Sequence, residues 1–97
     1  MTEEGDIKKT IKAKLRALGV VYYMVPQGAY CTPGAPDMVI IVNGHTFHTE
    51  VKTKTGRLEE DQKRMQRRIL EQGADYVVVR SAEDVINMIS PYLPKKV

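Results

Sequence analysis

The sequence has little cysteine and no long apolar run, and each absence argues against a class of protein. Cys31 is the single cysteine, so the chain has no intrachain disulfide, and a cysteine-based zinc site is not expected. A reducing compartment fits this composition, and we expect a cytoplasmic protein. No apolar stretch approaches the roughly 20 residues that span a bilayer, and the N-terminus is charged, so no membrane partner is expected.

The length and charge of the chain bound its organisation. Its 97 residues predict one domain, residues 1–97, whose small core would gain from self-association. The formal net charge of +3 fits a polyanionic partner without requiring one. The basic tail, residues 95–97, is expected to fray.

Apolar periodicity and turn residues predict an α/β fold. Apolar residues recur at helical spacing from Ile7 to Leu15, which predicts a helix over residues 2–18. The pair Asn43-Gly44 predicts a type I′ hairpin turn, because both central residues of that turn need positive φ. The remaining patterns predict strands at 20–25, 38–42, 45–52 and 76–80, a loop at 26–36, and helices at 58–72 and 81–89. The predicted order is αβββαβ with a C-terminal helix.

The register of this hairpin brings charged residues together at its open end. With a two-residue turn, Asp37 falls directly opposite Glu50, with Cβ atoms about 4.5–5.5 Å apart. Side chains alternate along a strand, so Lys52 shares the face of Glu50. Like charges opposed in this way repel, and we expect that removing either acid relieves the repulsion.

Two interpretations of this charged patch remain open. In one, Lys52 pairs with one acid and the other acid is solvated. In the other, Asp37 and Glu50 bind a divalent cation such as Mg²⁺, which takes one or two carboxylates and keeps several waters. The backbone carbonyl of Val51 is a further candidate ligand. A bulge in the hairpin would shift the register, and Asp37 would then no longer lie opposite Glu50.

Two polar residues lie on otherwise apolar helix faces. Gln62 shares a face with Met65 and Ile69. A buried amide needs hydrogen-bond partners, so Gln62 either caps backbone groups or faces the acidic patch. Glu4 shares the face of the first helix's apolar residues, and it either benefits from the helix N-terminus or adds a carboxylate to the patch. Glu3 is nearly as well placed as Glu4.

Together these residues resemble the PD-(D/E)xK nuclease superfamily. The stretches that carry the resemblance are "GAPD", which ends at Asp37, and "EVKTKTGRL", which begins at Glu50. Gln62 and Glu4 narrow it to the VRR-NUC group, the virus-type replication-repair nucleases, and in particular to its small stand-alone phage or bacterial members. The resemblance covers nearly the whole chain. It implies a restriction-endonuclease-like α/β core, with a mixed central sheet flanked by helices.

The resemblance also implies an activity, that of a metal-dependent, structure-selective DNA endonuclease that hydrolyses phosphodiester bonds. Asp37, Glu50 and the Val51 carbonyl would hold Mg²⁺ or Mn²⁺, with Glu4 in support through water. It implies that Lys52 orients or deprotonates the attacking water and that Gln62 orients the site. The other catalytic residues that it implies are Glu50, Asp37 and Glu4.

The resemblance further implies a partner and an oligomeric state. Small stand-alone members are homodimers that act on Holliday junctions, whereas larger repair nucleases use the domain as a monomer on flaps. A dimeric resolvase of branched DNA is therefore expected, with a monomeric flap nuclease as the alternative. A non-catalytic nucleic-acid-binding module, and a hydrolase of another phosphoester, are the competing classes. No base-reading motif occurs, so recognition should follow DNA shape.

Cationic residues follow the acidic patch in the sequence. Lys54 and Arg57, on the loop after the third strand, are the residues expected to hold DNA phosphates. Arg64, Arg67 and Arg68 either do the same or form a solvated helix face. The two histidines, at 45 and 48, point to opposite faces of a strand and cannot ligate one ion together.

Overall fold

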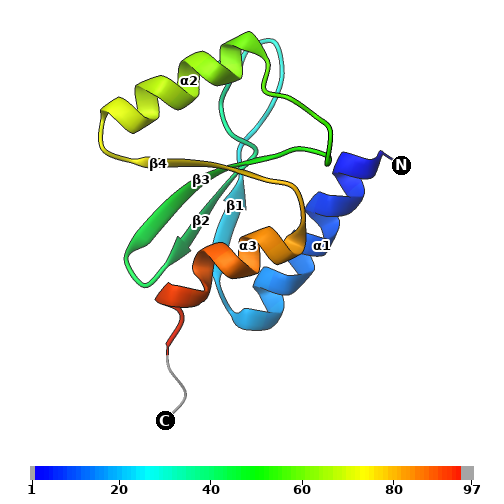
Figure 1. The fold of residues 1–97 in the computed structure, drawn as a ribbon, viewed down its shortest axis with the longest axis vertical. Helices are drawn as coiled ribbons and strands as arrows, with labels where there is room; N and C mark the ends of the chain where they lie inside the picture. Colours follow the sequence, from blue (N-terminus) through cyan, green and yellow to red (C-terminus); the bar gives the residue numbers. More distant parts are fainter. Residues whose placement is uncertain (1, 95–97) are drawn as a thin grey trace.

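A four-stranded mixed sheet lies at the centre of the computed structural model, which describes residues 2–94 (Figure 1). The elements are α1 (Glu3–Leu18), β1 (Val21–Met24), β2 (Met38–Val42), β3 (His45–Val51), α2 (Glu60–Glu71), β4 (Asp75–Val79), α3 (Ala82–Ile89) and a 3₁₀ helix (Ser90–Tyr92). This is the predicted order, and each predicted boundary is correct to within two residues. The tail that was expected to fray lies outside the described residues.

The sheet has the strand order β1-β2-β3-β4. Both hairpins, β1–β2 and β2–β3, are antiparallel, and β4 returns parallel to β3 after α2. The β2–β3 turn has the positive φ angles predicted for it, 46° at Asn43 and 79° at Gly44. Val42 lies opposite His45, so the predicted register is confirmed.

The helices cover the two faces of the sheet unequally. Figure 1 shows α1 and α3 side by side on one face and α2 on the other, beside β4. Alternate strand residues such as Ile40 and Val51 pack with Ile11 of α1 and Ile89 of α3, all fully buried, and form the core. No residue of α2 is buried to this degree, so α2 is held by fewer apolar contacts and depends more on its polar ones.

Local hydrogen bonds explain where the helices begin. Ser81 caps α3, because its Oγ accepts the Asp84 N–H at 3.1 Å. The N–H of Arg80 donates to Asp84 Oδ2 at 2.9 Å, which ends β4 one residue earlier than predicted. Helix α2 begins at Glu60, because Glu59 is its N-cap. No helix within residues 2–94 has the length and apolar character needed to cross a membrane.

Candidate active site

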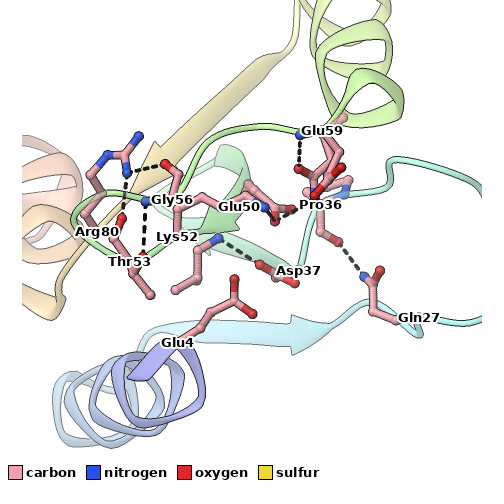
Figure 2. A network of polar contacts seen from close by, with 12 residues as sticks. Glu4, Gln27, Pro36, Asp37, Glu50, Lys52, Thr53, Gly56, Glu59 and Arg80 are labelled. Atoms are coloured by element: carbon pink, nitrogen blue, oxygen red, sulfur yellow. Dashed lines mark hydrogen bonds and ion pairs between the residues drawn. The ribbon is translucent and has the colours of Figure 1, made fainter. Parts of the chain in front are cut away.

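The open end of the β2–β3 hairpin brings the two predicted carboxylates together in a buried position. The observed register pairs Met38 with Thr49, and Asp37 and Glu50 are the next residues outward. Their exposed fractions are only 7% and 2%. Figure 2 shows both acids close to Lys52, and no bulge interrupts the hairpin. The predicted juxtaposition is therefore present.

Asp37 is held by two partners. Its Oδ2 accepts the backbone N–H of Val51 at 2.8 Å, and its Oδ1 lies 3.1 Å from Nζ of Lys8 on α1. The interpretation in which the second acid is simply solvated is wrong, because Lys8 and the hairpin enclose it. The same contacts correct the expectation that removing either acid relieves repulsion, since loss of the Asp37 charge would also leave Lys8 without this carboxylate.

Lys8 is a site residue that the sequence analysis missed. Its spacing carried a usable signal: Lys8 lies four residues after Glu4 and three before the buried Ile11, so it shares their face. Burial alone would lower the pKa of Lys8, but the adjoining carboxylates of Asp37 and Glu4 outweigh it and raise the pKa.

Glu50 has one engaged and one unengaged carboxylate oxygen. Its Oε2 accepts from Nε2 of Gln62 at 3.1 Å and lies 3.7 Å from Nζ of Lys52. Its Oε1 is buried and has no hydrogen-bond partner. Burial raises the pKa of Glu50 to about 8, and the neighbouring Asp37 adds to this while Lys52 opposes it. The patch therefore holds one carboxyl group that strongly disfavours negative charge unless a cation joins it.

Gln62 performs both of the functions that the sequence left open. Its Oε1 accepts the backbone N–H of Glu59 at 2.8 Å and so caps α2, while its Nε2 holds Glu50. One amide thus joins the start of α2 to the carboxylate patch, and the orientation of Glu50 depends on the position of that helix.

Glu4 approaches the patch indirectly. Its Oε2 lies 3.5 Å from Nζ of Lys8, and its side chain is 38% exposed. In Figure 2 it projects from α1 toward Asp37. Its charge also contributes to the raised pKa of Glu50, and no such effect of Glu3 is resolved. The geometry thus favours Glu4 over Glu3 as the residue near the site.

The loop after β3 is organised by Arg80, which the sequence analysis did not select. Nη1 of Arg80 donates to the carbonyls of Thr53 at 2.6 Å and Gly56 at 2.7 Å (Figure 2). This bonding fixes the loop that carries the exposed side chains of Lys54 and Arg57. Their contact with DNA stays a prediction.

The loop before β2 is fixed against α2 by a close approach at Gly34. Gly34 has a φ of 77°, and a Cβ there would overlap the carbonyl of Asp61 and lie 3.0 Å from the nitrogen of Gln62. At the base of the loop, Nε2 of Gln27 donates to the carbonyls of Val25 and Pro36 at 3.2 and 3.4 Å. The loop thus approaches Asp37 in a defined conformation.

The two histidines lie on opposite faces, as predicted, and each has a separate environment. His45 packs against the rings of Phe47 and Tyr92. Nδ1 of His48 lies 3.0 Å from the carbonyl oxygen of Asp75 and donates to it, because a carbonyl can only accept. Within residues 2–94, neither histidine forms a hydrogen bond with the carboxylate of Asp37 or of Glu50.

The donor set of the patch fits a hard divalent cation. Within residues 2–94 there is no cluster of three or more histidine, cysteine or acidic side chains that could hold a metal. Two buried carboxylates with an unengaged oxygen, Oε1 of Glu50, do match Mg²⁺, which needs one or two carboxylates and completes its shell with water and substrate oxygens. Zinc, which favours nitrogen and sulfur ligands, does not fit this set.

The fold is that of nucleases of the PD-(D/E)xK superfamily, and solved structures support this. One VRR_NUC domain is 30% identical with a TM-score of 0.77, over 95% of this chain and 99% of that one. A VRR_NUC domain protein is 18% identical with a TM-score of 0.74, over 96% of this chain and 89% of its own. Hjc, a Holliday junction resolvase of Archaeoglobus fulgidus, is 17% identical with a TM-score of 0.60, over 79% and 67% of the two chains.

No protein-family model and no curated protein gives a significant match to the sequence. The first of the three structures is similar over almost its whole length and at an identity that exceeds a likeness of fold alone. The chain belongs to the VRR-NUC family.

Proposed function

We propose that this chain is a Mg²⁺-dependent endodeoxyribonuclease that hydrolyses phosphodiester bonds at the patch formed by Asp37 and Glu50. The observation that carries the proposal is the buried Oε1 of Glu50, which has no hydrogen-bond partner in a carboxyl group whose pKa is raised to about 8. Unpartnered buried carboxylate oxygens are costly, and a bound cation would remove that cost. Membership of a nuclease family supports the same conclusion.

In this proposal, Asp37, Glu50 and the carbonyl of Val51 hold Mg²⁺ or Mn²⁺, and Glu4 supports them through water. When bound, the cation would supply Lewis acidity and a water nucleophile of lowered pKa. A bound cation would replace part of the contact between Asp37 and Lys8. When the cation is absent, Lys8 would hold the carboxylate of Asp37 in place.

The remaining residues of the patch would orient the reactants. Lys52, whose side chain is 12% exposed, would orient or deprotonate the attacking water and offset charge on the phosphate. Gln62 would hold the Glu50 carboxylate in one orientation through the contact already described. Lys54 and Arg57, on the loop fixed by Arg80, would hold phosphates of the DNA.

The preferred substrate in this proposal is a four-way DNA junction, and the active form is a cytoplasmic homodimer. One domain provides one carboxylate patch, and one site cuts one strand. Resolution of a junction therefore requires two copies, and two-fold dimers are the commonest oligomers. The neighbour Hjc is described as a Holliday junction resolvase, which supports junctions as substrates.

The experiment that tests the activity compares four-way, flapped and linear DNA with and without Mg²⁺. We expect cleavage that needs the cation. We also expect Lys52→Ala to lower the rate about 100-fold or more while Mg²⁺ binding, followed by calorimetry, is retained. DNA binding without any cleavage by the wild type would instead support the non-catalytic binding module.

The oligomeric state has its own test. Light scattering should give about twice the 11.0 kDa mass of the chain, and a cruciform plasmid should be linearised by paired cuts. A monomer that nicks the cruciform once, or that prefers flaps, would contradict the junction assignment while leaving the nuclease assignment in place.

A further inference from the structure

Two hollows open side by side between α2, β3 and the loop of residues 26–36. The larger, about 540 Å³, is lined by Thr32, His48, Met65, Arg68 and Ile69 among others. The smaller, about 170 Å³, shares Thr32, Met65 and Arg68 with it, so the two are continuous, and together they are called the α2 groove below. The larger hollow lies within the range of about 300–1,000 Å³ that is usual for small-molecule sites.

The α2 groove adjoins the carboxylate patch along two elements. On β3, His48 lies two residues before Glu50 and on the same face, about 7 Å away along the strand. On α2, Met65 and Ile69 follow Gln62 on one helix face. A group bound in the groove would therefore lie next to a phosphate bound at the patch.

The lining of the groove suits both the apolar face and the polar edge of an unpaired base. Half-buried Met65 and Ile69 and the ring of His48 provide an apolar surface. Thr32 and Gln72 add a hydroxyl and an amide that can pair with a base edge. Unpaired bases bind proteins through this combination of stacking and edge contacts, whereas a duplex hides the faces of its bases.

The charge of the groove suits a phosphate. Arg64 is paired with Asp61, with Nη1 of the arginine 3.0 Å from Oδ1 of the acid. Arg68 has no such ion pair within residues 2–94, so its guanidinium is available to a phosphate even though the acidic side chain of Glu71 also lines the larger hollow.

The wall of the groove is already formed. The close approach of Gly34 to Asp61 fixes the loop to α2, and the Ala35 N–H donates to the Thr32 carbonyl at 3.2 Å. A groove with a fixed wall loses less conformational entropy on binding than a mobile loop would.

We propose that the α2 groove holds one unpaired nucleotide of the DNA substrate next to the phosphate that is cut. This inference rests on the proposed nuclease function, and it would let the site distinguish DNA that has an unpaired nucleotide near the cut from fully paired DNA. Arg68 contacts the phosphate of the bound nucleotide, and Met65, Ile69 and His48 contact its base.

The test uses two adjacent arginines of equal charge, of which Arg68 lines the groove and Arg67 does not. Binding is measured by fluorescence anisotropy in EDTA, where no turnover occurs, on a duplex with a short oligothymidine flap and on the same duplex fully paired. We expect Arg68→Ala to weaken flap binding about five- to tenfold, the scale of one charged hydrogen bond, and duplex binding much less. Arg67→Ala should affect both DNAs equally and weakly.

A second readout follows the base itself. A 2-aminopurine at the first unpaired position should change its fluorescence when it enters the groove of the wild type, and His48→Ala should reduce that change. Equal losses for the two arginine variants on both DNAs, or an unchanged 2-aminopurine signal, would overturn the proposal. A lower molar mass of Arg68→Ala in light scattering would also overturn it, because the groove would then be an interface between copies.

The two proposals can fail separately. Cleavage by the wild type, with no difference between the arginine variants, would remove the nucleotide groove and keep the nuclease. Selective loss of flap binding in Arg68→Ala, without cleavage by the wild type, would do the reverse.

Discussion

Nζ of Lys8 lies 3.1 Å from Oδ1 of Asp37, and this ion pair ties the first helix to the open end of the central hairpin. The same ammonium lies 3.5 Å from Oε2 of Glu4. Lys8 thus offsets the negative charge of Asp37, whereas Lys52 lies near Glu50. Lys8 holds Asp37 in a buried position in the absence of a metal.

Replacement of Lys8 by methionine should separate its structural effect from its effect on the metal. In EDTA, Lys8→Met should lower the free energy of unfolding by about 1–2 kcal/mol, because Asp37 loses a charged partner in a largely buried position. Mg²⁺ should bind several-fold more tightly, because no ammonium competes for Oδ1. Urea unfolding and calorimetry measure the two effects.

Lys14→Met, on the exposed surface of the same helix, is the matched control and should change neither quantity. Unaltered stability and Mg²⁺ affinity in Lys8→Met would show that the ion pair has no role in holding Asp37.

The two acids should differ in their effect on stability, although we expect both to be needed for cleavage. Glu50→Gln should be as stable as the wild type or more so in EDTA, because glutamine is uncharged at every pH in an environment that disfavours charge. Asp37→Asn should be less stable by about 1–3 kcal/mol, because it breaks the pair with Lys8. Thermal melting in EDTA and a cleavage assay measure these effects, and full cleavage by either variant would contradict the metal-site assignment.

The raised pKa of Glu50 predicts how the stability of the metal-free chain depends on pH. In the folded chain this carboxyl group keeps its proton up to a pKa of about 8, whereas the unfolded chain releases it near 4.5. The stabilisation by the protonated group is therefore fully present below pH 4.5 and is lost as the pH rises toward 8. Between pH 5 and 8 the melting temperature of the wild type should fall relative to Glu50→Gln, by about 4 °C or more.

Mg²⁺ should oppose this loss, because a cation binds the ionised carboxylate and displaces its proton. The increase in melting temperature on adding Mg²⁺ should consequently be larger at pH 8 than at pH 5. Parallel pH profiles of the wild type and Glu50→Gln in EDTA would contradict the pKa assignment.

Gly34→Ala should lower the stability of the fold considerably more than Gly44→Ala. The two glycines have nearly equal φ angles, 77° and 79°, so alanine is strained alike at both. Only at Gly34 does the new Cβ overlap the backbone of Asp61, which should cost a further 1–3 kcal/mol or so. The overlap also displaces the start of α2, and with it Gln62, so the cleavage rate should fall in Gly34→Ala.

Gly44→Ala is the control for backbone strain, because nothing lies within 4 Å of the added Cβ there. A double-mutant cycle with Gln62→Ala completes the test. If Gly34 acts through Gln62, the two losses of cleavage rate should be less than additive. Full additivity would show that the loop contact does not act on the site through this amide.

Much of the fold and the centre of the site follow from short-range chemistry in the sequence. Asn43-Gly44 determined the hairpin turn, because only certain residues adopt positive φ easily, and the turn then determined the register. The two-residue period of a strand placed Lys52 beside Glu50. The helix caps at Thr2 and Ser81 are likewise local, since each bonds an N–H three residues ahead.

The tertiary structure decided what no local pattern specifies, the contacts between segments distant in the chain. Lys8 reaches Asp37, Arg80 holds the carbonyls of Thr53 and Gly56, and Gly34 meets Asp61 only because the helices pack on the sheet in this one arrangement. Burial belongs to the same level. The pKa of Glu50 is raised because the packed chain excludes water from its carboxyl group, and the sequence alone cannot show how much water remains.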